Sequence, residues 1–122
     1  MINKNDNVIE KLQKLQSKFA DERNWNKFHT AKNLSMALSV EVSELIEIFQ
    51  WISDDEIIIK IKNKKFKNSV SEEIADIFLY LIRIAEKLDI NIEESVLNKL
   101  EKNKIKYPVD LSKNNATKYN KR

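Results

Sequence analysis

The chain has 122 residues, of which 42% are hydrophobic, so it is long enough for one domain with a hydrophobic core. Gly is absent and Pro occurs once, which leaves few residues for tight turns with positive φ and favours an all-helical domain. Without Cys, disulfides, thiolate zinc sites and thiol nucleophiles are excluded, and the single His excludes a multi-histidine metal site within one chain. The net charge of +3 is modest for a protein that binds nucleic-acid polymers.

The chain shows no sign of a membrane segment. No apolar run approaches the ~20 residues that span a bilayer, and residues 1–6 lack the apolar stretch of a signal peptide. We therefore expect no membrane partner and a cytoplasmic location. Residues 1–110 are expected to form the domain, and residues 111–122 a polar basic tail.

Hydrophobic periodicity predicts two helices in the first half of the chain. The first covers residues 7–20, and Asp6 is its expected N-cap. Its apolar stripe consists of Val8, Leu12, Leu15 and Phe19. An aromatic loop at 23–29 leads to a second helix at 30–51. The core stripe of that helix consists of Leu34, Leu38, Leu45, Ile48 and Ile52.

The second half of the chain predicts two or three more helices. Ser53 begins a capping signal, and a short lysine-rich helix is expected at 57–66. Ser71 is the expected N-cap of a helix that reaches residue 88 and is apolar around much of its circumference. Asn91 and Glu94 resemble a capping box for a last helix, which stops before Pro108.

Two acid-x-x-acid motifs lie within this apolar, helix-forming sequence: Glu41 with Glu44, and Glu73 with Asp76. Residues three apart on a helix share a face, so each motif can present two carboxylates on one side. If the two apolar stripes pack antiparallel, the carboxylates converge at the edge of the core. Clustered like charges are costly unless a cation compensates them. Oxygen ligands favour Mg²⁺ or Mn²⁺ there and disfavour zinc.

The competing interpretation is that these acids are solvated groups on amphipathic helices. The motif pattern alone favours neither this interpretation nor the cation site. Glu47 and Glu72 lie nearby and are possible additional ligands. Ferritin-like di-iron chemistry needs a Glu-x-x-His pair, which this chain lacks. The lysines between residues 60 and 67 are interpreted as a solvated face rather than a nucleic-acid patch.

Several segments around the acidic motifs indicate a protein family. They are ERNWNKFH at 22–29, ALSVE at 37–41, FQW at 49–51 and NKIKYPV at 103–109. With the acidic motifs, these segments resemble the all-α nucleoside triphosphate pyrophosphohydrolase superfamily, which includes the MazG proteins and the dimeric dUTPases. They are most similar to its single-domain dCTP pyrophosphatase branch, and the resemblance covers nearly the whole chain.

The resemblance implies a four- to five-helix MazG-like bundle that assembles as a homo-oligomer. A homotetramer built as a dimer of dimers is expected, with a dimer as the alternative. The implied reaction is Mg²⁺-dependent hydrolysis of a deoxynucleoside triphosphate, dCTP or a modified dCTP, to the monophosphate and pyrophosphate in nucleotide-pool sanitation. Two alternatives remain: a pyrophosphohydrolase that prefers dUTP or damaged nucleotides, and a non-enzymatic helical interaction module.

The resemblance also assigns the site residues. Glu41, Glu44, Glu73 and Asp76 would hold the metal. We add the hypothesis that Glu41 or Glu44 orients or deprotonates the attacking water as the general base. The implied substrate-binding residues are Gln16, Trp25, Asn26, Lys27, Phe28, His29, Trp51, Tyr80, Lys99 and Asn103. Gln16 stands where the animal members carry a His, so the base preference stays open.

Overall fold

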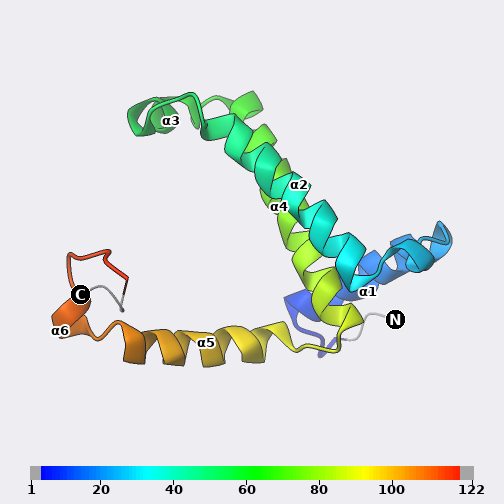
Figure 1. Cartoon of the computed structure of the whole chain (residues 1–122). Coiled ribbons are helices and arrows are strands. Elements are labelled where there is room, and N and C mark those ends of the chain that lie inside the picture. Colours follow the sequence, from blue (N-terminus) through cyan, green and yellow to red (C-terminus); the bar gives the residue numbers. More distant parts are fainter. Residues whose placement is uncertain (1–3, 119–122) are drawn as a thin grey trace. The chain divides into compact units, whose positions relative to one another are not determined.

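The computed structural model describes residues 4–118, which form helices and no β-strand (Figure 1). The chain divides into a first unit that ends at Asp89 and a second that begins at Ile90. The first unit contains α1 (Val8–Glu22), the 3₁₀ helix η1 (Asn26–Phe28), α2 (Ala31–Phe49), α3 (Asp54–Lys60) and α4 (Lys64–Lys87). The second contains α5 (Ile92–Lys106) and α6 (Val109–Ser112). The expected all-helical class is confirmed for this part of the chain.

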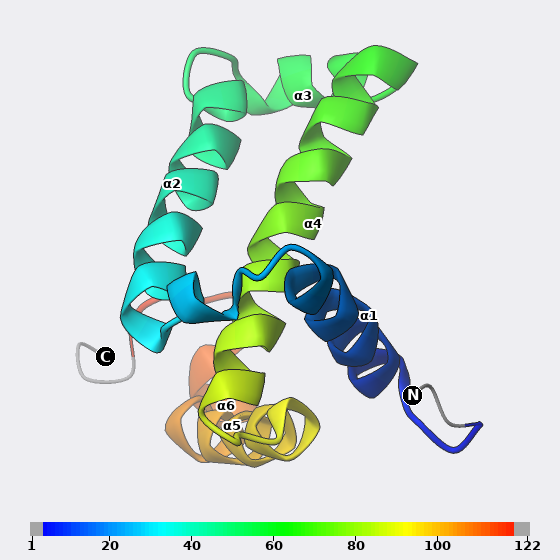
Figure 2. The same cartoon turned by 90° about the vertical axis from the view of Figure 1, so that its right-hand side faces the viewer.

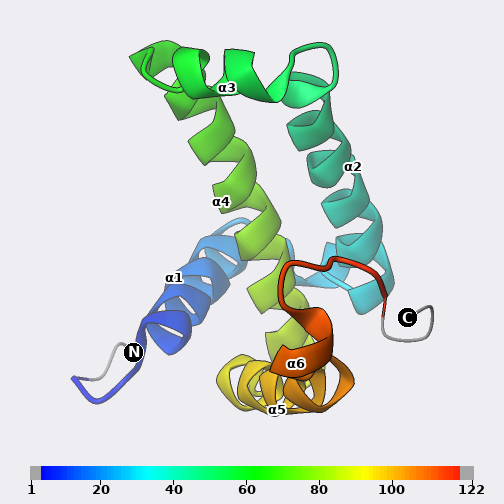
Figure 3. The ribbon, with the colours of Figure 1, turned by 90° about the vertical axis from the view of Figure 1, so that its left-hand side faces the viewer.

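In the first unit, α2 and α4 form an antiparallel pair joined at one end by α3 (Figures 2 and 3). Helix α1 packs against α4 near the opposite end of that pair. The arrangement places the middle of α2 beside the middle of α4, and these two segments carry the acidic motifs. Few residues among 4–118 are buried: Ala20, Leu34, Val70, Ile82, Arg83 and Ala85.

The helix starts agree in part with the predicted caps. Ser53 caps α3 through a complete capping box with Glu56, and the Asn91 side chain accepts a hydrogen bond at the start of α5. Asp6 was the wrong cap for α1: the Asn7 side chain accepts the Glu10 amide at 2.8 Å. Asp6 instead forms an ion pair with Lys14 at 2.8 Å.

The predicted boundary at Ser71 is also wrong. Helix α4 begins at Lys64, because the Asn63 side chain caps the Phe66 amide and the helix continues through Ser71 without interruption. The Phe66 ring packs edge-on against Phe49 at the end of α2, with ring centroids 6.3 Å apart. The predicted lysine-rich helix at 57–66 is therefore divided between α3 and the first turn of α4.

The turn that follows α1 contains a residue with left-handed backbone conformation, Asn24, although the chain has no Gly. Asn24 has φ 54°, its amide donates to Asp21 O, and the Trp25 amide donates to Ala20 O at 2.9 Å. These two hydrogen bonds form a Schellman motif, which turns the chain sharply into η1. The left-handed conformation is tolerated by Asn and by Gly, but it places the Cβ of most other residues against the backbone.

Asn24 therefore supports the loop that follows it. We expect Asn24→Ala to lower the free energy of unfolding by about 1 kcal/mol, and Asn24→Gly to leave it unchanged within about 0.5 kcal/mol. Urea denaturation followed by far-UV circular dichroism measures both variants. Equal destabilisation by Ala and Gly would show that the Asn side chain, rather than the backbone conformation, is what matters.

The apolar stripes differ in how well a single chain covers them. The α2 stripe faces α4, with Leu34 buried and the other members half-buried. The predicted α1 stripe is largely exposed, because Gln13 and Gln16 face α4 and donate to its backbone carbonyl groups. None of the helices formed by residues 4–118 is long and apolar enough to cross a lipid bilayer.

Candidate functional site

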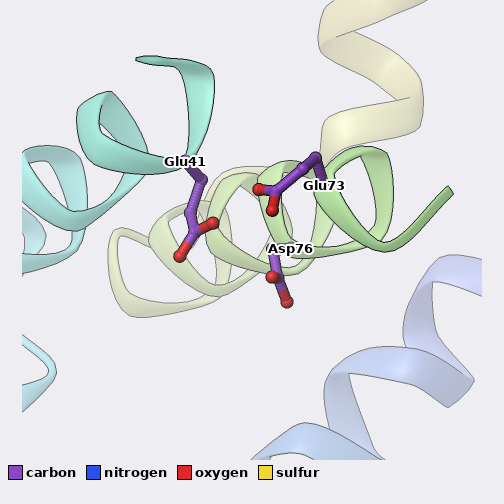
Figure 4. Close-up of side chains that lie close together, drawn as sticks. All are labelled: Glu41, Glu73 and Asp76. Atoms are coloured by element: carbon purple, nitrogen blue, oxygen red, sulfur yellow. The ribbon is translucent and has the colours of Figure 1, made fainter. Parts of the chain in front are cut away.

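Three carboxylates converge where α2 passes α4: Glu41 from α2, and Glu73 and Asp76 from α4 (Figure 4). One ligand oxygen from each lies within 4.8 Å of the other two. Glu73 and Asp76 share a helix face because they are three residues apart. The antiparallel pairing of the helices brings Glu41 opposite them, as the sequence predicted.

Two of these carboxylates hold buried oxygens without a hydrogen-bond donor. Within residues 4–118, Oε2 of Glu41 and Oε2 of Glu73 are buried and unpartnered. Burial, followed by the nearby carboxyls of Glu44 and Glu73, raises the pKa of Glu41 to about 7. Burial also raises the pKa of Glu73, and the charges of Glu44 and Asp76 add to that effect. Among residues 4–118, no Lys or Arg is ion-paired with Glu41 or Glu73 to compensate this negative charge.

Glu44 lies outside the three-carboxylate cluster but close to it. It is exposed on α2, one turn beyond Glu41, and its charge acts on both Glu41 and Glu73. Glu44 and Glu73 also line the same open hollow between α2 and α4. The structure therefore brings three of the four predicted metal ligands within reach of one ion and leaves Glu44 at the edge.

The donor set fits a hard divalent cation. Carboxylate oxygens are the ligands that Mg²⁺ and Mn²⁺ prefer, and an ion bound here would accept electron density from the two unpartnered oxygens. An ion would also offset the burial and the neighbouring acidic groups that together raise the pKa of Glu41. The cluster contains no nitrogen or sulfur ligand that would favour zinc.

Two other predicted site residues lie on α4 or against it: Tyr80 and Gln16. Tyr80 lies one turn beyond Asp76 on α4, and burial, followed by the charges of Glu41 and Asp76, raises its pKa. The Gln16 side chain of α1 donates to Leu79 O at 3.2 Å, and its own Oε1 is buried without a partner among the described residues. Gln16 therefore holds α1 against α4 and keeps a free acceptor.

The aromatic loop between α1 and α2 is packed against the helices. The Trp25 ring contacts Phe19 edge-on, with centroids 5.6 Å apart, and lies 6.3 Å from the His29 ring. Phe28 is exposed, and the Lys27 ammonium lies 5.2 Å from the centre of its ring. The loop thus presents aromatic surface while its backbone is fixed by η1.

A buried arginine that sequence reasoning missed fixes this loop. Arg83 of α4 is 1% exposed and donates to His29, Asn26, Ser17 and Glu86. The Asn26 amide also donates to Asp21, so both polar ends of this side chain are engaged within the chain. The signal was present in the sequence: Arg83 is a single charge inside the apolar run YLIRIA, at 80–85.

The remaining predicted residues are not brought to the acids by the first unit. Trp51 follows α2 and is 85% exposed. Lys99 and Asn103 lie on α5, in the second unit. The charge of Lys106, together with a side-chain contact to it, lowers the pKa of Lys99, so these two ammonium groups lie close together on one face of α5.

Comparison with known proteins agrees with this architecture. A family model described as the MazG-like family matches residues 36–121. The chain belongs to the MazG-like family. It is 38% identical to dCTP pyrophosphatase 1 of Mus musculus and 34% identical to dCTP pyrophosphatase 1 of Homo sapiens. Each match covers 112 residues and 92% of this chain, and the chain spans 66% of the length of these relatives.

The fold of this MazG-like chain is also found in a solved structure. The crystal structure of a pyrophosphatase from Archaeoglobus fulgidus superimposes with a TM-score of 0.79 at 42% sequence identity. The match covers 88% of this chain and 99% of the other. The predicted family is therefore confirmed, and both kinds of relative are named for cleavage of a pyrophosphate bond.

Proposed function

We propose that this chain is a metal-dependent nucleoside triphosphate pyrophosphohydrolase that converts dCTP, or a modified dCTP, and water to the monophosphate and pyrophosphate. The observation that carries the proposal is the cluster of Glu41, Glu73 and Asp76, with its two unpartnered buried oxygens. The names of the relatives, dCTP pyrophosphatase 1 and a pyrophosphatase, support the choice of reaction. Such an activity would remove unwanted nucleotides from the deoxynucleotide pool.

Glu41, Glu73 and Asp76 would hold Mg²⁺, with Mn²⁺ as a substitute and Glu44 as a further ligand or an acid beside the ion. A bound ion of this kind screens the charge of a triphosphate and lowers the pKa of coordinated water. The carboxylates would also determine where a triphosphate binds. Their negative charge repels phosphate, so the phosphates would approach only where the cation lies between the two.

Glu44 is the better placed of the two candidate bases. Glu41 contributes an oxygen to the three-carboxylate cluster, whereas Glu44 is exposed at the edge of that cluster. A general base needs an oxygen free to accept a proton from the attacking water. We therefore assign Glu44 as the residue that orients the water or takes its proton.

The aromatic loop and Tyr80 would bind the nucleoside. Trp25 and Phe28 offer exposed ring surface for stacking on a base, and the exposed Trp51 offers more. Tyr80 lies beside the acids and would border the site where the phosphates bind. Lys99 and Asn103 of α5 would bind phosphate oxygens as a point charge and an amide donor.

A cytosine preference has one specific support in this chain. Gln16 Oε1 is a buried acceptor with no partner among residues 4–118, and the Gln16 amide nitrogen is already engaged with Leu79 O. An unpaired acceptor favours a base that carries an amino group over one that carries a carbonyl group at the same position. Cytosine carries an amino group at the position where uracil carries a carbonyl group, so the free acceptor of Gln16 favours cytosine.

A panel of nucleoside triphosphates tests the proposed function. The full chain is incubated with Mg²⁺ and each of dCTP, dUTP, dTTP, dATP, dGTP and CTP, and pyrophosphate and monophosphate are measured. We expect stoichiometric release of both, fastest from dCTP and absent after chelation of the metal. Faster hydrolysis of dUTP would overturn the base preference alone. No hydrolysis of any nucleotide would overturn the enzyme and favour a helical interaction module.

We further propose that the chain self-associates, as a homotetramer built from two dimers or as a dimer. Large apolar side chains are exposed on both helices that carry the acids: Met36, Val40, Ile46, Ile74, Phe78 and Leu81. A single chain leaves this surface in water, which is unfavourable by roughly 25 cal/mol per Å² of apolar area.

The mass in solution checks self-association. We expect sedimentation equilibrium to give two or four times the chain mass of 14.4 kDa. Phe78→Arg places a charge on the exposed face of α4 and is expected to shift the protein to lower mass. A wild-type protein that sediments as a monomer at about 10 µM would contradict the proposal, because apolar interfaces of standard size usually bind more tightly than this.

A further inference from the structure

Arg83 joins the aromatic loop to two helices, and its position inside the molecule is unusual for a cation. Its guanidinium is hydrogen-bonded to residues of α1, η1 and α4, and the residue is 1% exposed. Nη1 donates to Ser17 Oγ at 2.8 Å and to Glu86 Oε1 at 2.9 Å, and Nη2 donates to Asn26 Oδ1 at 2.6 Å. Nε donates to His29 Nδ1 at 3.2 Å. A buried charge is tolerated only when it is paired and hydrogen-bonded in this way.

The bond to His29 determines where that ring carries its proton. Arginine has five N–H donors and no acceptor, so an atom that meets it must offer a lone pair. His29 Nδ1 is therefore unprotonated, and the neutral ring must carry its hydrogen on Nε2. Within residues 4–118, the structure shows no hydrogen bond from this Nε2 to another protein group.

The charges around the ring also favour its neutral form. Burial, followed by the positive charges of Arg83 and Lys87, lowers the pKa of His29. The nearby acids are engaged elsewhere in the network: Glu86 is ion-paired with Arg83, and Asp21 accepts from Asn26. The ring is thus held as a neutral donor, with a single polar hydrogen available for a ligand.

We propose that Arg83 is a positioning residue that holds the loop from Trp25 to His29 and locks His29 in its Nε2–H tautomer, so that the ring donates to an oxygen atom of the bound nucleotide. The effect on nucleotide binding rests on the proposed function, whereas the tautomer does not. Arg83 itself has four protein partners and does not need to touch the substrate.

The tautomer can be measured directly, because His29 is the only histidine in the chain. The full-length protein is labelled with ¹⁵N-histidine, and long-range ¹H–¹⁵N correlation spectra are recorded near neutral pH without nucleotide. We expect Nδ1 to show the shift of a nonprotonated nitrogen and Nε2 that of a protonated one. A ring protonated on Nδ1, or on both nitrogens, would overturn the proposal.

Arg83→Met retains the volume of the side chain and removes all its donors. We expect His29 to become a mixture of tautomers, and KM for dCTP to rise roughly 10- to 100-fold with a smaller change in kcat, since the loop is displaced but the acids are not. Lys87→Met is the matched control: it removes the other cation near His29 but no donor to Nδ1. It should keep a single tautomer and a near wild-type KM.

The two possible failures can be told apart. An Arg83→Met protein that keeps the Nε2–H tautomer, or loses kcat while KM is unchanged, would overturn the positioning role. If circular dichroism shows that this variant is unfolded, the wild-type tautomer still decides the proposal. A wild-type protein that hydrolyses no nucleotide but holds the Nε2–H tautomer would overturn the proposed function. It would not contradict the claim that Arg83 fixes the tautomer of His29.

Discussion

Replacing Glu44 with Gln is expected to lower kcat for dCTP by roughly 10²- to 10⁴-fold, the contribution usual for a general base. Gln keeps the size of the side chain and can still donate a hydrogen bond, but it cannot accept a proton from the attacking water. KM should change less than kcat, because Glu41, Glu73 and Asp76 would still hold the metal. Steady-state measurement of pyrophosphate release gives both constants.

Glu72→Gln is the matched control for this variant. Glu72 is an exposed acid on α4, next to Glu73 in sequence but outside the cluster. It should keep nearly full activity, and both variants should keep the helical far-UV circular dichroism of the wild type. A Glu44→Gln enzyme with near wild-type kcat would remove Glu44 as the base and leave Glu41 as the candidate.

Replacing Glu41 with Gln is expected to stabilise the metal-free protein and to abolish its stabilisation by Mg²⁺. The pKa of Glu41 is raised from 4.5 to about 7 in the folded chain, so between these values the folded state binds more protons than the unfolded state. The stability that the protonated form provides is fully present below about pH 4.5 and is lost as pH rises through about 7.

Thermal unfolding of the metal-free proteins measures this effect. The wild-type Tm should fall between about pH 5 and about pH 8, and Mg²⁺ should restore it at the higher pH, because an ion that binds only the folded state stabilises it. Glu41→Gln mimics the protonated acid, so its Tm should fall less with pH and should not respond to Mg²⁺. A wild-type Tm that rises across this range without metal would contradict the raised pKa.

The acidic site was predictable from sequence because it depends on helix geometry. A three-residue step on a helix fixes which carboxylates share a face, and the apolar stripes fix which faces meet. This reasoning placed Glu41 opposite Glu73 and Asp76 correctly. It did not separate Glu44 from the cluster, because that requires the rotation of α2 about its axis relative to α4.

Other features depended on competition between local groups and could not be predicted from the pattern. Asn63 and Ser71 are both acceptable N-caps, and the packing of Phe66 on Phe49 accompanies the earlier one. In α1 the apolar stripe predicted a core-facing side, yet the polar groups of Gln13 and Gln16 face α4 and bond to its carbonyls. The apolar stripe left exposed is consistent with the proposed self-association.

The aromatic loop illustrates the same limit. The sequence marked its rings as unusual for a linker, but the residue that holds it in place, Arg83, lies 54 positions beyond His29 in the chain. Charged residues within apolar helical runs are common at the surface, so the pattern alone does not reveal burial. Only the packing of α1, η1 and α4 shows that this arginine is buried and donates four hydrogen bonds.

The position of bond cleavage tests the central claim most directly. The full-length protein is incubated with dCTP and Mg²⁺ in water enriched in ¹⁸O, and the masses of the products are measured by mass spectrometry. Attack at the α-phosphorus predicts dCMP that carries one ¹⁸O atom and pyrophosphate that carries none. Label in the pyrophosphate, release of orthophosphate in place of pyrophosphate, or no hydrolysis at all would contradict the proposed reaction.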